Sequence, residues 1–175
     1  MKTTKLLLLT AAACFSFAAC SDDDTSNNDN NGDNENIKLG TYYLVGVNIT
    51  EEVDFNEDGQ GSSNLMNEST CYENSYITLN EDHTFTSSYN YVDFAAESGC
   101  HVEDGEGTWE ISGDILTITN TIMDVPLEMI YTVSEDGSIL ISTMANSPYP
   151  TRDEEGNPVY ETGSVQLVYN FPDEE

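Results

Sequence analysis

The stretch GTWEISGDILTITN, residues 107–120, limits the fold of this chain more than any other segment. Its centre, Gly113-Asp114, is a two-residue hairpin loop with glycine first, as a type II′ turn requires. The loop fixes three antiparallel pairs: Ser112 with Ile115, Ile111 with Leu116, and Trp109 with Ile118. In that register all four large apolar side chains fall on one face of the hairpin: Trp109, Ile111, Leu116 and Ile118.

Six further segments show the same period of two between turn signals, and none shows a convincing helical period. They are 40–49, 75–80, 84–92, 126–134, 138–143 and 162–171. In the first, we expect one face to carry Tyr43, Val45, Val47 and Ile49. With the two strands of the hairpin they make eight, which predicts an all-β fold: a small eight-stranded antiparallel up-and-down β-barrel. An open sandwich is the alternative.

Two stretches between these strands are expected to be loops. The first is HVEDGEG, 101–107, which we interpret as a solvated acidic loop. The second follows residue 143 and contains Pro148, Pro150, Gly156 and Pro158, residues that normally mark turns.

The N-terminal segment has the layout of a secretory signal. A basic head with Lys2 and Lys5 precedes an apolar run that is too short to cross a bilayer. The run ends in Ala18-Ala19-Cys20, which resembles a bacterial lipobox, and Ser21 with three following aspartates resembles the surface-export signal of Bacteroidota lipoproteins. The resemblance implies an outer-membrane lipoprotein that faces the cell exterior, lipidated on Cys20. The alternative is an ordinary signal peptide with an incidental cysteine.

This interpretation divides the chain into three parts. Residues 1–19 are the signal peptide, 20–37 the lipidated cysteine with a disordered acidic tether, and 38–172 the folded domain. The tether, rich in Ser, Asp and Asn, has too little apolar surface to offset the entropy of ordering it. The lipid on Cys20 would hold the protein to the outer membrane without a transmembrane helix.

The charge of the chain restricts its partners. The formal net charge is −29, and removal of Lys2 and Lys5 with the signal peptide would make it −31. Such a charge argues against nucleic acid and anionic membrane surfaces as partners, and it favours cations. We expect a monomer.

Two cysteines remain inside the folded domain, Cys71 and Cys100. An even pair in an oxidising compartment predicts a disulfide. It would close a loop of about 30 residues and stabilise the fold by about 3–4 kcal/mol. Metal-binding thiols are the alternative, but the chain has no CxxC and only two histidines.

Several segments of the domain occur in a familiar order. GTYYL, DFNEDGQGSSNL, CYENSYITLNEDHTF, a second cysteine and GTWEISGDILTI follow one another. The order resembles the lipocalin-like domain of Bacteroidota lipoproteins, with Tyr42 in the place of the usual tryptophan. The resemblance implies an eight-stranded barrel that holds a small apolar or amphipathic ligand. The inward candidates for binding it are Trp109, Ile111, Leu116, Ile118, Leu167 and Tyr169. The alternative is that these side chains simply fill the interior of so short a barrel.

The segment DFNEDGQGSSNL, 54–65, is a candidate calcium loop. It supplies oxygen ligands at the spacing of an EF-hand-like loop: Asp54, Asn56, Asp58, the carbonyl of Gln60, and Ser62. Position twelve is Leu65, where a bidentate glutamate belongs. The alternative is an acidic loop that binds nothing specific.

No motif for catalysis is present. The chain contains no GxSxG, HExxH, P-loop or GxGxxG, so we expect a binding protein rather than an enzyme. The rival hypothesis is a cation-stabilised surface module that interacts with glycans or proteins without an internal ligand.

Overall fold

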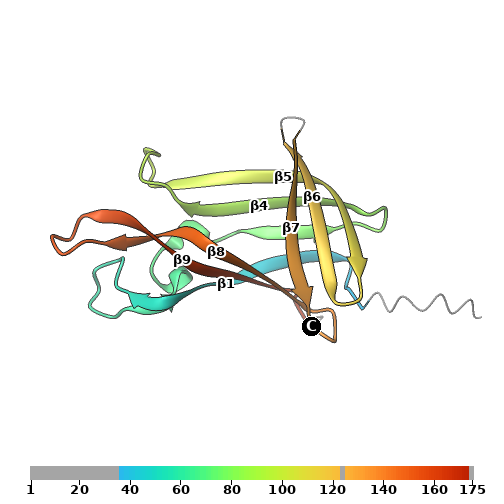
Figure 1. Cartoon of the computed structure of the whole chain (residues 1–175), viewed down its shortest axis with the longest axis horizontal. Helices are drawn as coiled ribbons and strands as arrows, with labels where there is room; N and C mark the ends of the chain where they lie inside the picture. Colours follow the sequence, from blue (N-terminus) through green and yellow to red (C-terminus); the bar gives the residue numbers. More distant parts are fainter. Residues whose placement is uncertain (1–35, 123–124, 174–175) are drawn as a thin grey trace, which may run out of the picture. The chain divides into compact units, whose positions relative to one another are not determined.

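The computed structural model of the chain describes residues 36–122 and 125–173. The predicted signal peptide, Cys20 and most of the tether therefore lie outside the described residues. The strands are β1 Gly40–Val53, β2 Ser62–Asn64, β3 Tyr76–Leu79, β4 Thr84–Val92, β5 Cys100–Ser112, β6 Ile115–Ile122, β7 Val125–Val133, β8 Ile139–Arg152 and β9 Pro158–Asn170 (Figure 1). Two 3₁₀ turns, η1 Leu65–Asn67 and η2 Thr70–Tyr72, stand between β2 and β3. Within these ranges, no helix has the length and apolar character needed to cross a membrane.

Eight of the strands close into an antiparallel barrel, as the sequence predicts. They follow the order β1-β3-β4-β5-β6-β7-β8-β9, and β9 pairs back onto β1. The short β2 is an addition that pairs only with β1. Closure through β1 and β9 excludes the open sandwich.

The β5–β6 hairpin has the predicted register. The observed pairs include Ser112 with Ile115, Ile111 with Leu116, and Trp109 with Ile118. Gly113 has φ of 64°, the positive value that the first position of a type II′ turn requires. The predicted common face points inward, because Trp109, Leu116 and Ile118 are all buried.

The first half of β1 faces the opposite way from the prediction. Tyr43 and Val45 are 50% and 49% exposed, whereas Tyr42 and Leu44 are buried. The register between β1 and β9 shifts between Leu44 and Gly46, so one residue is extra there. Such a β-bulge reverses the face of every later residue, and the predicted Val47 and Ile49 therefore do point inward.

The acidic stretch 101–107 was wrongly expected to be a loop. It belongs to β5, and β4 pairs with β5 along the whole length of β4, from Thr84 with Thr108 to Val92 with Cys100. The strand is hard to predict from the sequence, because the stretch is rich in acidic residues and glycine, and both disfavour strands on their own. The long partner strand β4 supplies the pairing that overrides this preference.

The proline-containing stretch after residue 143 is also a strand in large part. Pro148 and Pro150 lie inside β8, which pairs with β9 up to Arg152 and Pro158. On its other side β8 pairs with β7 only at Ile141 and Leu140. Beyond these two pairs β8 is a sheet edge, where a residue without a backbone N–H is tolerated. Only residues 153–157 remain as the turn.

Residues before β1 cover one end of the barrel through Tyr42. Its buried hydroxyl accepts the backbone N–H of Lys38 at 3.0 Å and donates to the carbonyl oxygen of Gly137 at 2.7 Å. Asn36 hydrogen-bonds through its side chain to the carbonyl of Glu135. Burial raises the pKa of Tyr42 to about 12. These hydrogen bonds fix the segment before β1 to the turn between β7 and β8 at this end of the barrel.

Candidate functional site

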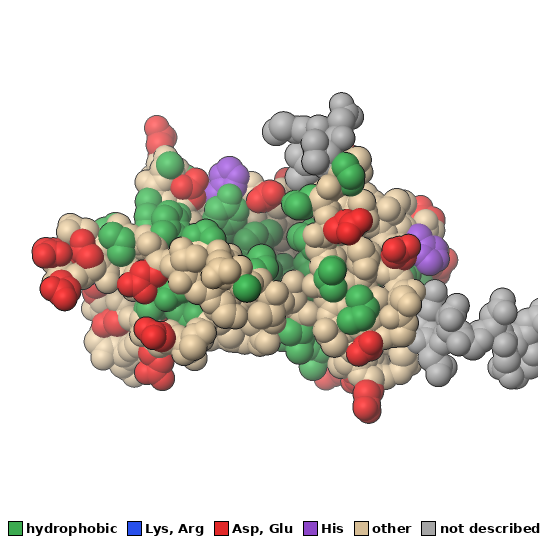
Figure 2. Space-filling model, viewed as in Figure 1, with side chains coloured by type: hydrophobic (Ala, Val, Ile, Leu, Met, Phe, Trp, Pro, Cys, Tyr) green, Lys and Arg blue, Asp and Glu red, His purple; other side chains and the backbone are tan. Residues whose placement is uncertain are grey.

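The barrel interior is not filled along its whole length. Where β7 and β8 separate, two adjacent cavities of about 310 and 230 Å³ remain, and both are lined by Tyr89, Glu103 and Met144. Figure 2 shows apolar side chains gathered in a hollow on this face of the molecule. We call the larger the tyrosine cavity and the smaller the Asn120 cavity.

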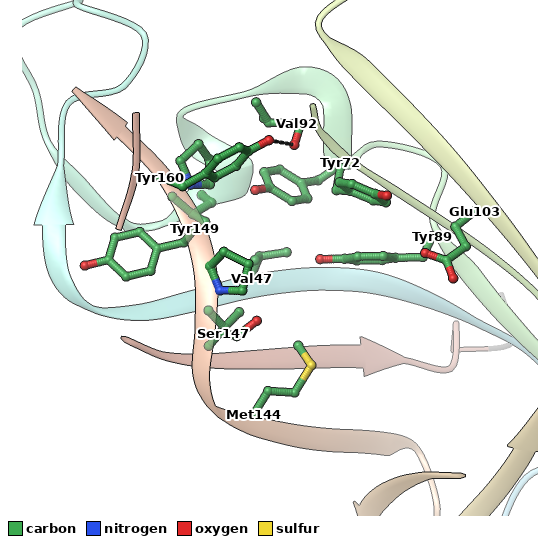
Figure 3. A pocket seen from close by; sticks show the side chains of 14 residues that line it. Val47, Tyr72, Tyr89, Val92, Glu103, Met144, Ser147, Tyr149 and Tyr160 are labelled. Carbon is green, nitrogen blue, oxygen red and sulfur yellow. Dashed lines mark hydrogen bonds between the residues drawn. The ribbon is translucent and has the colours of Figure 1, made fainter. Parts of the chain in front are cut away.

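Tyrosine side chains from four elements line the tyrosine cavity: Tyr72, Tyr89, Tyr91, Tyr149 and Tyr160. Figure 3 labels four of them, Tyr72, Tyr89, Tyr149 and Tyr160. Tyr89 and Tyr91 are stacked, with ring centroids 5.5 Å apart. The Tyr160 hydroxyl donates to the carbonyl oxygen of Val92 at 2.8 Å, and the Tyr149 hydroxyl donates to Glu161 at 3.1 Å. The first bond joins β9 to β4, the second joins β8 to β9, and both fix the wall of the cavity.

The buried phenols of both cavities stay uncharged in neutral solution. Burial raises the pKa of Tyr89 to about 12, with smaller contributions from Tyr91 and Glu103. Burial likewise raises the pKa of Tyr72, Tyr131 and Tyr169 above the ordinary value. The tyrosines therefore offer aromatic surface and neutral hydroxyls, not negative charge.

The Asn120 cavity has one polar wall and one apolar wall. The side chains of Ser87 and Asn120 both lie against Gly105. A Cβ on this glycine would come within 2.6 Å of Ser87 Oγ and 2.8 Å of Asn120 Nδ2. Asn120 is only 5% exposed, and its Oδ1 has no hydrogen-bond partner within the described residues. The apolar wall comes from β6, β7, β8 and β9, and it includes Ile118, Leu127, Met129, Met144 and Leu167.

In the part of the chain that the structure describes, no basic side chain lines either cavity. The whole chain has four Lys and Arg, of which Lys38 and Arg152 lie in the described domain. Arg152 donates to the carbonyl oxygens of Phe55 and Gly156 and pairs with Glu57 at 3.3 Å. Lys38 lies 5.4 Å from the centre of the Phe171 ring. Both cations are thus held outside the cavities.

The structure separates the six predicted ligand residues into two groups. Ile118, Leu167 and Tyr169 line the Asn120 cavity. Trp109 and Leu116 are buried in the core away from both cavities, and the Trp109 ring stacks on His83 at 4.4 Å. Half-buried Ile111 lies beside Gly113 and Asp114, at the turn of its hairpin.

Sequence reasoning missed Glu103 and Tyr89 as cavity residues. Glu103 was assigned to a loop, although it lies in β5 directly opposite Tyr89 in β4. The signal that could have found it is the length of β4, because nine strand residues need a partner of comparable length. Extending the hairpin register back along β5 places Glu103 on the inward face.

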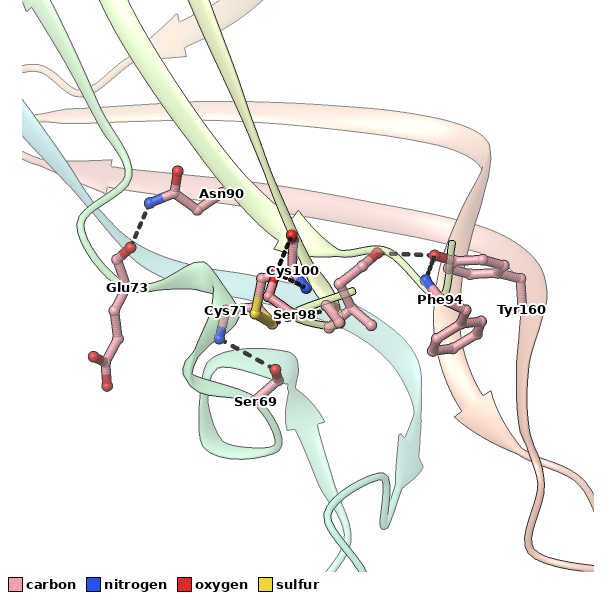
Figure 4. Close-up of a disulfide and its surroundings, with 10 residues drawn as sticks. Ser69, Cys71, Glu73, Asn90, Phe94, Ser98, Cys100 and Tyr160 are labelled. Carbon is pink, nitrogen blue, oxygen red and sulfur yellow. Dashed lines mark hydrogen bonds between the residues drawn. A yellow bond between two sulfur atoms is a disulfide. The ribbon is translucent and has the colours of Figure 1, made fainter. Parts of the chain in front are cut away.

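The predicted disulfide joins Cys71 in η2 to Cys100 at the start of β5 (Figure 4). The Cα atoms are 5.4 Å apart, and 29 positions separate the cysteines in sequence. Ser69 Oγ accepts the N–H of Cys71 at 3.2 Å, and Ser98 Oγ donates to the carbonyl of Cys100 at 2.9 Å. The disulfide fastens the 3₁₀ segment to the end of the barrel that holds the tyrosine cavity.

The predicted calcium loop is held by its own hydrogen bonds. Asp54 accepts the backbone N–H groups of Asp58 and Gly59 at 3.1 and 3.0 Å. Asn56 Oδ1 also accepts from Asp58, and Asp58 accepts from Gln60. Ser62 begins β2 and donates to Asn64. No cluster of three acidic, His or Cys side chains suited to a metal occurs in the described part, and calcium binding here stays a prediction.

The fold and its cavities define a class of protein: a small closed antiparallel β-barrel that keeps an apolar space inside. The sequence profile of the lipocalin-like domain matches residues 39–145, and the chain belongs to that family. The match ends inside β8, so β9, which closes the barrel, lies beyond it. No curated protein matches the chain.

Proposed function

We propose that this chain is a surface-anchored lipoprotein whose barrel binds a small apolar or amphipathic molecule without covalent chemistry. The observation that carries the binding function is the pair of adjacent cavities in the barrel interior, about 310 and 230 Å³. Cavities that hold small ligands have volumes of about 300–1,000 Å³ and mostly apolar walls with a few polar groups. Membership of the lipocalin-like family supports the same function.

The anchoring part of the proposal depends on the N-terminal sequence. Ala18-Ala19-Cys20 has the order of a lipobox, and the acidic residues after it follow the surface-export pattern. A lipid on Cys20 would keep the barrel at the outer membrane, with the acidic tether as a spacer. Binding at the cell exterior would then deliver or withhold a poorly soluble molecule.

Binding can be tested with Nile red, a neutral dye whose fluorescence rises in apolar surroundings. The full chain would carry Cys20→Ser, so that no attached lipid competes for the cavities. Met144 lines both cavities and is accessible from solvent, so Met144→Trp should fill them and lower the affinity about tenfold or more. Thr143→Trp adds a comparable bulk on the exposed side of the same strand.

The proposal predicts saturable fluorescence for the parent chain and for Thr143→Trp, with a clear loss for Met144→Trp. Absence of saturable binding by the parent chain would contradict the binding function. Equal affinity in both tryptophan variants would show that the dye binds elsewhere. Mass spectrometry of organic extracts of the purified chain would then identify the natural ligand.

A further inference from the structure

The charged side chains that line the cavities are all acidic. Among the residues that the structure describes, Glu103 is the single charged residue of the tyrosine cavity, and it also lines the Asn120 cavity together with Asp104. It lies at the junction of the two spaces, and Figure 3 shows its carboxylate close to Tyr89. Glu103 is itself exposed to solvent, and a molecule that spans both cavities would contact this carboxylate.

The aromatic wall next to Glu103 also favours positive charge. Tyr89 is its direct partner across β4 and β5, and Tyr91 stacks on Tyr89. The electron-rich faces of such rings attract ammonium groups, by about 0.5–1 kcal/mol when exposed and by more when water is excluded. A carboxylate bordered by tyrosine rings is therefore complementary to an organic cation.

The second polar feature is an acceptor without a donor. The Oδ1 atom of Asn120 is buried on the wall of the smaller cavity and lacks a hydrogen-bond partner within the described residues. A buried acceptor of this kind costs about 1–3 kcal/mol when it is left without a donor. A ligand N–H group would satisfy it.

An anionic ligand meets the opposite conditions. Within residues 36–122 and 125–173, no Lys, Arg or His lines either cavity. A buried carboxylate or phosphate group without a cation is strongly unfavourable, and here it would also face Glu103. Fatty acids and other anionic lipids therefore do not fit these walls.

We propose that the barrel takes an organic cation: an ammonium group, held by Glu103 and Asn120, on an apolar body that packs against Met129, Met144 and Leu167. This inference rests on the proposed binding function and narrows its ligand class. The acidic exterior of the chain, with a net charge of −29, would draw such a cation toward the barrel.

The test compares three molecules that share one alkyl chain: decylamine, which is cationic near neutral pH, decanol and decanoate. Isothermal titration calorimetry with the Cys20→Ser chain measures each affinity. We expect decylamine to bind about tenfold more tightly than decanol or better, and decanoate to bind most weakly. Glu103→Gln should lower the decylamine preference over decanol about fivefold, the size of a partly solvated charge interaction.

Glu110→Gln is the matched control, because Glu110 lies in the same strand, is exposed and lines neither cavity. It removes the same charge and should leave the preference unchanged. If decanoate binds as tightly as decylamine, or if Glu103→Gln leaves the preference intact, this inference is wrong while the binding function stands. If none of the three molecules binds, the proposed function itself fails.

Discussion

At the residue scale, the Tyr42 hydroxyl group holds together two segments at one end of the barrel. Tyr42 is fully buried, and its hydroxyl links the segment before β1 to the turn between β7 and β8. Those segments are far apart in sequence, so no local preference could bring them together. The hydroxyl therefore acts as a tertiary contact between these two segments.

Tyr42→Phe should lower the free energy of unfolding by about 1–3 kcal/mol, because the Lys38 N–H and the Gly137 carbonyl lose their partner. Urea unfolding followed by tryptophan fluorescence measures this. Tyr43→Phe is the control, since the neighbouring side chain is half exposed, and it should change stability by less than about 0.5 kcal/mol. Equal effects of the two variants would contradict a special role for Tyr42.

At the element scale, strand lengths are set by partners more than by composition. β5 runs through an acidic, glycine-containing stretch because β4 offers a partner along its full length. β8 accommodates two prolines because its outer edge is free after Leu140 and Ile141. Along this free edge β8 is no longer paired with β7, and the cavities lie beside the unpaired part of β8. The disulfide then fixes η2 to β5 beside that space.

The double variant Cys71→Ser, Cys100→Ser should lose about 3–4 kcal/mol of stability, because its unfolded chain is no longer cross-linked. Urea unfolding of the parent chain with and without dithiothreitol provides the matching measurement. The reductant should reproduce the loss in the parent chain and leave the double variant unchanged. A parent chain that is equally stable when reduced would refute this contribution.

At the scale of the whole molecule, the buried phenols make the barrel sensitive to alkali. Tyrosine ordinarily ionises at pH 10.0, whereas burial raises the pKa of Tyr42 and Tyr89 to about 12 and that of Tyr72, Tyr131 and Tyr169 as well. Between about pH 10 and pH 12, the unfolded chain releases phenol protons that the folded chain retains. Stability is therefore complete below the unfolded pKa and is lost as pH rises through the folded value.

Unfolding free energies measured in urea at several pH values should thus fall steeply above about pH 10, by up to about 1.4 kcal/mol per pH unit for each retained proton. Tyr131→Phe should reduce this slope, since Tyr131 is one of the buried phenols with raised pKa. A stability that stays constant between about pH 9 and pH 11 would contradict the role of burial.

The sequence alone determined the features that depend on neighbours along the chain. The period of two predicted eight strands, although it missed the first half of β5 and the second half of β8. Gly113-Asp114 predicted the hairpin register, and the even pair of cysteines predicted the disulfide. Three of the six predicted ligand residues, Ile118, Leu167 and Tyr169, do line a cavity. These predictions succeeded because turn geometry and side-chain alternation are local properties.

Only the tertiary structure decided the features that depend on closure. The bulge in β1 reversed the face of Tyr43 and Val45, and no local pattern marks an extra residue that only its pairing with β9 reveals. Glu103 reaches the cavity wall through pairing with β4, and the smaller cavity is lined by both β7 and β8, which part after two pairs. A closed sheet must match strands that are distant in sequence, and that matching, rather than composition, placed the site.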